Sequence, residues 1–287
     1  MLQSLLVDGI VVGSVYALVA VGMTIIFGVL GQINFAHGEY YMVGAFAAWW
    51  AIARLGLSYP ASIPITLAVV AGVAVVVGVV VMQRLVDARF EAGIIATLGV
   101  SLLLQNAATL LFGGTFKMFY GGWIAPVEIL GTDIATQRII IFVATLLVFA
   151  ALECLVRYTQ VGKTMRAVSQ NVECCQVLGV DVRRVVLVTF VLGTVLAALS
   201  GVLTAPLVVN VYGAMGAAIT LKSFAVIVMG GMGNIGGTLL GGWVLGIAES
   251  LVAGYLGLQF RDAVGFGILI LMLLWRPGGF FSAKVRY

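Results

Sequence analysis

The chain has 287 residues, of which 62% are hydrophobic and only 9% are charged, and its formal net charge is +4. A water-soluble fold cannot keep so many apolar side chains away from water, so the composition predicts an integral membrane protein. No soluble stretch exceeds roughly 30 residues, which leaves no room for an appended catalytic domain. Helices satisfy their own backbone hydrogen bonds in lipid, and no β-barrel alternation of apolar and polar residues is visible. We therefore predict an all-α fold, a polytopic transmembrane helical bundle forming one domain over residues 1–287.

Nine apolar segments are candidate membrane spans, because a helix needs about 20 apolar residues to cross the hydrocarbon core. In chain order they are residues 5–29, 38–53, 61–82, 92–112, 139–155, 185–209, 217–232, 235–253 and 260–275. The segment 217–232 would be only about 24 Å long as a helix. It is therefore either a crossing or a half-helix that lines a cavity, so we expect about eight or nine spans, some of them broken or re-entrant.

Glycine accounts for 37 of the 287 residues, and many glycines recur at a spacing of four. The clearest cases are Gly9 and Gly13, Gly193 and Gly201 around Ala197, Gly233, Gly237 and Gly241, and Gly242 and Gly246. This spacing lets the backbones of two helices approach closely in lipid. We expect ordinary close helix packing at these positions.

Lysine and arginine in short loops favour the cytoplasmic side of a membrane. One set of loops holds ten of them: Arg84, Arg89, Arg157, Lys163, Arg166, Arg183, Arg184, Arg276, Lys284 and Arg286. The other set holds four: Arg54, Lys117, Arg138 and Arg261. We therefore place residues 157–184 and the C-terminus in the cytoplasm. The N-terminus then lies outside if the number of crossings is odd, and inside if one crossing is lost. The external segment 113–137 is either a docking face for an external partner or a solvated connector.

Two glycine-rich breaks interrupt the apolar pattern, one in each half of the chain, and each places an asparagine between glycines. Irregular backbone at membrane depth is tolerated only where it lines a cavity or is buried in protein. We therefore predict that both breaks line a translocation pathway and suspect a distant internal repeat. The candidates are Gly31, Asn34, His37, Gly38 and Glu39 in the first break, and Gly230, Gly233, Asn234 and Gly236 in the second.

His37 is the only histidine in the chain and is followed closely by Glu39. One histidine and one carboxylate fall short of the three or four ligands of a zinc site, so we expect no metal and no other cofactor. A proton relay is also disfavoured, because proton-coupled carriers hold more acidic groups within their spans. The alternative to a pathway role is that Asn34, His37 and Glu39 cap a restarted helix and hold the break in place.

Lys222 and Glu249 fall within apolar segments. Charged side chains there normally pair, face an interior or lie near an interface. Pairing of Lys222 with Glu249 is one interpretation. Extension of the Lys222 side chain to the outer membrane surface is the plainer one.

The cytoplasmic segment 161–181 contains Gly162-Lys163-Thr164, which is similar to the end of a phosphate-binding loop. That loop needs a glycine where this chain has Arg157, so we expect no ATP site here. The spacing of Met165, Val168, Val172 and Cys175 predicts one amphipathic helix that Gly179 ends in a left-handed conformation. Its apolar stripe would fit a groove on a partner protein or lie flat on the membrane surface.

Three motifs, read in order, carry a family resemblance. They are Gly-Gln-Ile-Asn-Phe-Ala-His-Gly-Glu at residues 31–39, the segment 162–181 with its Leu-Gly-Val-Asp ending, and the glycine-rich segment 230–249. Together they resemble the LivH-type permease of bacterial branched-chain amino acid ABC importers over nearly the whole chain.

The resemblance implies a non-catalytic, multi-pass subunit of the bacterial inner membrane, surrounded by membrane lipid. Its implied partners are a homologous LivM-type permease, two cytoplasmic ABC ATPase subunits and a periplasmic substrate-binding protein, with no nucleic acid. The segment 162–181 resembles the loop that docks into the ATPase, with candidates Gly162, Lys163, Arg166, Val168, Val172, Glu173, Gly179 and Asp181. Glu173 is followed by Cys174 and Cys175, whereas importers more broadly have two alanines there.

Three other functions remain open at this point. A relative of the same architecture would import urea, short amides or aromatic acids. An ion-coupled secondary carrier or channel would need no ATPase. An intramembrane enzyme is the poorest alternative, because no serine, cysteine or paired-carboxylate constellation supports it.

Overall fold

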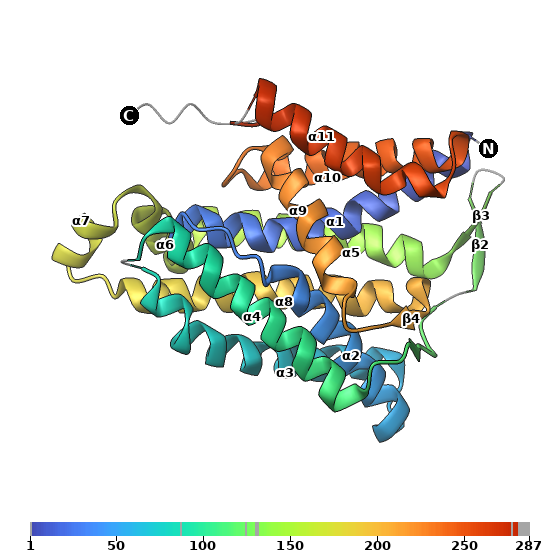
Figure 1. The fold of residues 1–287 in the computed structure, drawn as a ribbon, viewed down its shortest axis with the longest axis horizontal. Helices are drawn as coiled ribbons and strands as arrows, with labels where there is room; N and C mark the ends of the chain where they lie inside the picture. The colour runs from blue at the N-terminus through green and yellow to red at the C-terminus, as the bar shows by residue number, and fades with distance from the viewer. Residues whose placement is uncertain (1, 87, 124, 130–131, 277, 281–287) are drawn as a thin grey trace.

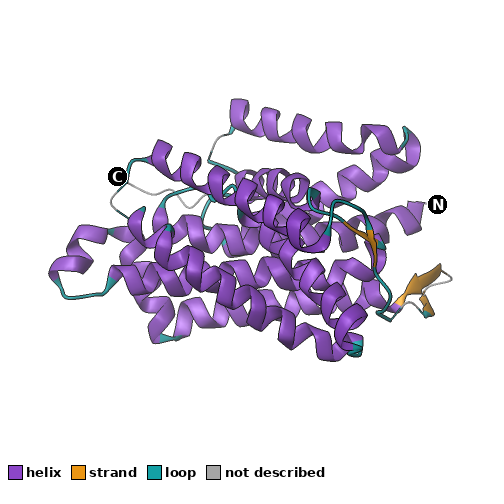
Figure 2. Cartoon of the chain, turned by 60° about the horizontal axis from the view of Figure 1, so that its bottom comes forward, coloured by secondary structure: helices purple, strands orange, loops and turns teal. Residues whose placement is uncertain are grey.

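The computed structural model describes residues 2–86, 88–123, 125–129, 132–276 and 278–280. Lys284 and Arg286 lie outside these described residues. The helices are α1 (Leu2–Leu30), α2 (His37–Leu55), α3 (Tyr59–Val80), α4 (Phe90–Phe112), α5 (Thr136–Tyr158), α6 (Gln160–Gln170), α7 (Val172–Val177), α8 (Val182–Val208), α9 (Met215–Gly230), α10 (Ile235–Tyr255) and α11 (Arg261–Trp275). The short 3-10 helices are η1 (Met82–Arg84) and η2 (Leu258–Phe260). The fold is an all-α polytopic bundle (Figures 1 and 2).

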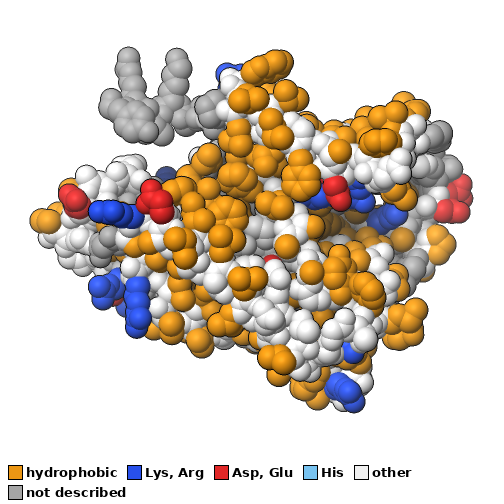
Figure 3. All heavy atoms as spheres, viewed as in Figure 1, with side chains coloured by type: hydrophobic (Ala, Val, Ile, Leu, Met, Phe, Trp, Pro, Cys, Tyr) orange, Lys and Arg blue, Asp and Glu red, His pale blue; other side chains and the backbone are white. Residues whose placement is uncertain are grey.

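The predicted spans correspond to helices of the structure. Seven helical segments in the described part of the chain are long and apolar enough to cross a membrane: α1, α3 with η1, α4, α5, α8, α10, and α11 with η2. The other two predicted spans are α2, which begins with polar residues, and α9, which has 16 residues. On the face seen in Figure 3, charged side chains lie mainly towards the two ends of the molecule, with hydrophobic side chains between them. This arrangement suits a bundle surrounded by lipid.

Helix α1 is the central element, and nearly all of its residues from Gly9 to Ile26 are buried. It packs against α8 on one side and α10 on the other. Glycines allow these close contacts: Gly22 faces the backbone of Gly193 in α8, and Gly13 faces that of Gly242 in α10. The close packing predicted from the four-residue spacing of glycine is therefore present on both sides of α1.

Four short strands lie at one end of the bundle, which we call the hairpin end. β2 (Pro126–Ile129) and β3 (Thr132–Ala135) pair as an antiparallel hairpin that projects beyond the helices at the same end as the N-terminus (Figure 2). β1 (Lys117–Met118) pairs with β4 (Asn210–Val211). Nearby, the Gln137 amide donates hydrogen bonds to Tyr59 and to the Leu203 carbonyl, at 2.9 and 2.7 Å. These bonds fix the start of α5 against α3 and α8.

Helices α6 and α7 lie at the opposite end, which we call the α6–α7 end (Figure 1). The sequence predicted a single helix here, and that prediction is wrong: the chain becomes extended at Asn171. The Asn171 side chain accepts a hydrogen bond from the Cys174 N–H at 2.8 Å and so caps a second helix. Gly179, as predicted, has a positive φ of 81°.

The apolar stripe of this segment also differs from the expectation. Met165, Val168 and Cys175 are buried, because α6 packs on α1, α5 and α8, and α7 packs on α8. The stripe therefore attaches the segment to the rest of this chain. It is free neither for a partner's groove nor for the membrane surface.

Candidate functional site

A re-entrant segment follows α1. The chain turns at Gly31, which has a φ of 65°, and residues 31–36 run back into the bundle before α2 begins (Figure 1). The His37 Nε2 atom lies 3.0 Å from the carbonyl oxygen of Val19. Val19 precedes the end of α1 by eleven residues, or about 16 Å of helix. Helix α2 thus begins near the middle of the bundle.

Helix α9 begins at the same depth. The Gly38 N–H donates a hydrogen bond to Thr220 Oγ1 at 2.9 Å, and Gly216 lies against the backbone of Gly38. The two helices approach so closely because neither residue has a side chain. Two helix N-termini therefore meet in the interior, one from each half of the chain.

Polar side chains of the first break hold this meeting point in place. Asn34 Oδ1 accepts a hydrogen bond from the Ala36 N–H at 3.0 Å. Glu39 Oε1 accepts hydrogen bonds from Ser101 at 3.0 Å and Gln105 at 2.7 Å, both on α4. Asn34, His37 and Glu39 are all buried. These contacts support the interpretation in which the polar residues stabilise the break.

The second glycine-rich segment has a different place. Helix α9 ends at Gly230 and α10 begins at Ile235, so residues 231–234 form a turn between two helices. Asn234 caps α10 by accepting a hydrogen bond from the Gly237 N–H at 3.0 Å. Gly233 and Gly236 are exposed, whereas Gly230 is buried against Gly237. The turn lies near the end of α1, since Gly233 faces Gly28. Of the two glycine-rich segments, only the first therefore starts a helix at mid-depth.

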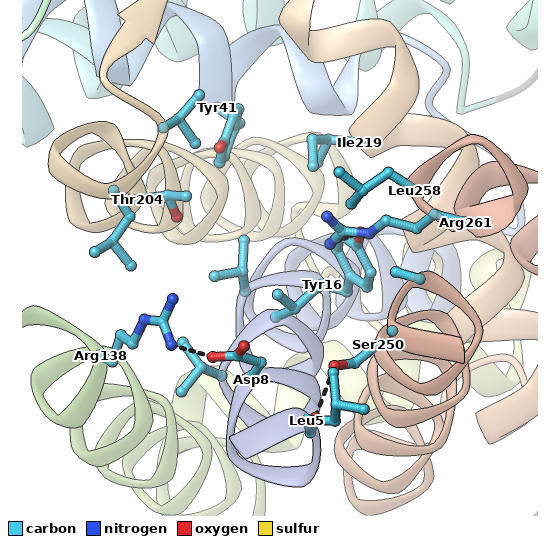
Figure 4. A pocket seen from close by; sticks show the side chains of 17 residues that line it. Leu5, Asp8, Tyr16, Tyr41, Arg138, Thr204, Ile219, Ser250, Leu258 and Arg261 are labelled. Atoms are coloured by element: carbon cyan, nitrogen blue, oxygen red, sulfur yellow. Dashed lines mark hydrogen bonds and ion pairs between the residues drawn. The ribbon is translucent and has the colours of Figure 1, made fainter. Parts of the chain in front are cut away.

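A large cavity of about 490 Å³ lies towards the hairpin end, between α1, α2, α5, α8, α9, α10 and the start of α11 (Figure 4). We call it the large cavity. Much of its wall is apolar and comes from Leu5, Val11, Val12, Val15, Leu207, Val208, Ile219 and Leu258. Its polar side chains are Asp8, Tyr16, Tyr41, Arg138, Thr204, Ser250 and Arg261. The predicted pathway residues do not line it, but Tyr41 and Ile219 place the starts of α2 and α9 in its wall.

Three charged side chains reach the large cavity, an ion pair on one side and an arginine on the other (Figure 4). On one side, Arg138 of α5 forms an ion pair with Asp8 of α1, and both side chains are more than a third exposed. On the other side, the guanidinium of Arg261 lies beside Tyr16. An apolar space between charged groups suits a small amphipathic solute.

Behind Arg261 lies a buried charge network centred on Glu249, whose side chain is fully buried. Lys222 Nζ lies 3.0 Å from Glu249 Oε1, and Arg261 Nε lies 3.1 Å from Glu249 Oε2. The Tyr16 hydroxyl donates a hydrogen bond to Oε2 at 2.7 Å, and Asp262 lies 2.8 Å from Lys222. Pairing of Lys222 with Glu249 is therefore confirmed, and extension of Lys222 to the membrane surface is wrong. Residues from α1, α9, α10 and α11 meet at this one carboxylate.

A small cavity of about 90 Å³ lies towards the α6–α7 end. Its lining includes Thr24 of α1, Met165 and Arg166 of α6, and Gly233 of the second glycine-rich segment. Along α1, Thr24 is eight residues, or about 12 Å, from Tyr16 in the wall of the large cavity. Between the two cavities, α1 contacts His37 at Val19.

The predicted coupling residues lie on and around α6 and α7. Lys163, Arg166, Glu173, Gly179 and Asp181 are exposed, Val172 is partly buried, and Gly162 and Val168 are buried. Within α6, α7 and the turn after them, the most exposed apolar side chains are Val177 and Leu178, at 88% and 77%. The sequence did not single out these two residues. The sequence feature that could have indicated them is an apolar pair directly before Gly179.

The family model described as the permease component of the branched-chain amino acid transport system matches residues 5–273. The chain belongs to this family. The LivH permease of the high-affinity branched-chain amino acid transport system of Escherichia coli is 33% identical, with 95% of this chain and 92% of LivH covered. The corresponding BraD protein of Pseudomonas aeruginosa is 34% identical, with 96% and 94% covered. The LivM permease of Escherichia coli is 24% identical, with 92% and 67% covered.

Two solved structures are similar to this chain in fold. PsaBC from Streptococcus pneumoniae in complex with Fab matches with a TM-score of 0.50 at 12% identity, covering 94% of this chain and 91% of that one. A metal-chelate type ABC transporter in an inward-facing conformation also gives 0.50, at 18% identity, covering 93% and 86%. At these identities the likeness concerns the fold alone.

Proposed function

We propose that this permease is the non-catalytic membrane subunit of an ABC importer that carries branched-chain amino acids across the bacterial inner membrane. The observation that carries the proposal is the match of the permease family model to residues 5–273. The chemistry of the large cavity supports it, because an aliphatic amino acid combines an apolar side chain with a charged head group. Apolar walls beside Arg138 and Arg261 suit both parts.

The two cavities suggest the course of the pathway. In this proposal the solute enters the large cavity from outside, passes the point where His37 contacts Val19, and leaves through the small cavity. The section of the pathway at His37 is closed, and the other residues that hold it closed are those of the first break: Gly31, Asn34, Gly38 and Glu39. Gly233 lies at the exit, next to the other candidates of the second glycine-rich segment, Gly230, Asn234 and Gly236. A solute can then be released only if α1, α2 and α9 shift relative to one another.

The partners follow from the same proposal. A LivM-type permease would complete the membrane part, since LivM is itself similar to this chain along most of its length. A periplasmic substrate-binding protein would deliver the amino acid at the hairpin end, and membrane lipid would surround the apolar helices. Two cytoplasmic ABC ATPases would hydrolyse ATP at the opposite end.

The α6–α7 end is the proposed contact with the ATPases. Because the apolar stripe is buried against this chain, the partner would contact the other face, which presents Lys163, Glu173, Val177, Leu178 and Asp181. Buried Gly162, Val168 and partly buried Val172 would transmit the movement to α1, α5 and α8. Arg166 lines the small cavity, so a displacement of α6 would reach the proposed exit directly.

Replacing Gly179 with valine is expected to uncouple transport from ATP hydrolysis while leaving the protein folded in the membrane. The φ of 81° disfavours a residue with a Cβ by about 1–2 kcal/mol, although an added Cβ would meet no neighbouring atom. The strain would therefore change the shape of the exposed turn and not the bundle. Uptake and ATPase rates of the purified complex measure the effect. Gly179→Asn is the control, because asparagine tolerates this conformation. Normal coupling in Gly179→Val would contradict the assignment.

Competition for uptake tests the substrate class. Cells that express this permease with its partners are given labelled leucine and an excess of unlabelled competitor, and cells without the permease serve as the control. Isoleucine and valine are expected to suppress uptake, whereas urea, acetamide and phenylalanine leave it unchanged. Suppression by urea, amides or aromatic acids but not by isoleucine would assign the permease to a different substrate class.

A further inference from the structure

The geometry points to Arg261 as the residue that binds the α-carboxylate of the transported amino acid in the large cavity. This inference rests on the proposed function and deepens it. Arg261 is the first residue of α11, and its side chain is 34% exposed. Figure 4 shows its guanidinium extending into the cavity between Tyr16 and Ile219.

The hydrogen bonds of Arg261 leave part of the guanidinium available. Its Nε donates to Glu249 Oε2 at 3.1 Å, and Nη2 donates to the Tyr16 hydroxyl at 3.3 Å. A guanidinium has five N–H donors in a planar fork. Among the described residues, no atom accepts a hydrogen bond from Nη1, and Tyr16 accepts from only one of the two N–H groups of Nη2. One N–H of Nη1 and the second N–H of Nη2 point in the same direction, so this free edge of the guanidinium matches the two oxygens of an α-carboxylate.

The surrounding charges favour an anion at this place. Two cations, Lys222 and Arg261, share the single buried carboxylate of Glu249. The other anion of the network, Asp262, pairs with Lys222, and its side chain is 70% exposed and therefore well solvated. The network is formally neutral, with two cations and two anions, but only Arg261 of the four lines the cavity, so the wall presents a positive group there, and the N-terminus of α11 adds to it. Both arginines of the cavity have a carboxylate partner, but Asp8, the partner of Arg138, itself lines the cavity, whereas Glu249, the partner of Arg261, does not.

The apolar wall beside Arg261 has a complementary role. Val12, Val15, Ile219 and Leu258 line the same cavity and come from α1, α9 and η2. A carboxylate held on Arg261 would leave an aliphatic side chain in contact with this wall, where its burial is favourable. Arg261 would therefore recognise the head group common to amino acids, and the wall would select for apolar side chains. Tyr16 and Glu249 are positioning residues that orient the guanidinium.

Ligand binding to the purified complex without the binding protein tests the inference directly. Leucine is compared with leucinamide, in which a neutral amide replaces the carboxylate, by isothermal titration of the wild-type complex, R261Q and R261K. R261Q is expected to weaken leucine binding at least about tenfold and to leave leucinamide binding unchanged. R261K is expected to stay weak for leucine, because lysine restores the ion pair with Glu249 but not the fork. R54Q, which removes an exposed arginine outside the cavity, is the matched control and should bind as wild type.

Several results would overturn the inference. Equal weakening of leucine and leucinamide by R261Q would assign Arg261 a structural role only, and so would full recovery of leucine binding in R261K. Wild-type leucine binding and uptake in R261Q would show that the carboxylate binds elsewhere. A wild-type complex that neither binds nor imports leucine, but imports another solute, would instead refute the proposed function.

Discussion

Replacing Gly246 with valine is expected to break the contact between α1 and α10 and to leave little folded protein in the membrane. A Cβ at position 246 would overlap backbone atoms of Gly9 and Gly13, which cannot move aside as a side chain can. Overpacking of a well-packed interior typically costs about 1–3 kcal/mol. The cost is expected at the upper end here, because α1 is the central helix and packing is a principal source of helix association in lipid. Gel filtration in mild detergent and thermal unfolding measure the loss.

Gly99→Val and Gly72→Val are the matched controls for this experiment. Both glycines lie within membrane helices, α4 and α3, and an added Cβ at either position would meet no atom within 4 Å. Valine adds the same volume at all three positions. The control variants are therefore expected to behave as wild type. If Gly246→Val were as stable as Gly99→Val, α1 and α10 would not be packed as described.

Replacing Glu249 with leucine is expected to be similarly damaging, for an electrostatic reason. Glu249 pairs with both Lys222 and Arg261, and its side chain is fully buried. Removing one partner of a buried ion pair typically costs about 3–5 kcal/mol, because the remaining charge is left uncompensated. The melting temperature of the purified complex should fall accordingly.

The double variant Lys222→Met with Glu249→Leu separates this explanation from a simple packing defect. Two apolar residues in place of a buried ion pair are often neutral in stability, so the double variant is expected to recover part of the loss. A double variant less stable than Glu249→Leu alone would show that Lys222 and Glu249 do not act as a pair. The fold would then owe its stability at this point to other contacts of Lys222, such as Asp262.

The membrane helices could be predicted from the sequence because lipid imposes a simple rule of length and composition. All nine apolar segments became helices, and the short segment at residues 217–232 became the 16-residue helix α9. The re-entrant segment was signalled by Gly31 and Asn34, which interrupt an apolar run. The depth at which α2 restarts could not be predicted, because it depends on the contact of His37 with α1.

The predictions that failed concern segments whose residues can form more than one local structure. Asn171 has the right type and position to cap a new helix, and its side chain ended the helix predicted from the apolar stripe. The second glycine-rich segment has the composition of a break, but the same residues also make a turn between helices. Composition cannot distinguish a turn at the membrane end from a break at mid-depth.

The large cavity was missed because its lining comes from seven helices spread along the whole chain. Lys222 and Glu249 were noticed as charges within apolar segments, and their pairing was one of two interpretations. Asp8, Arg138 and Arg261 lie at the ends of spans, where charged residues are common. Only the arrangement of α1, α5 and α11 in space shows that these three side chains reach one cavity (Figure 4).

The central claim is that this permease has no motor of its own and moves solute only when separate ATPases drive it. The most direct test is leucine accumulation in liposomes that contain either the permease alone or the complete complex, with the binding protein outside and ATP inside. The complete complex is expected to accumulate leucine against its gradient and to stop when ATP is omitted, and the permease alone is expected to accumulate none. Accumulation by the permease alone under an ion gradient would contradict the claim.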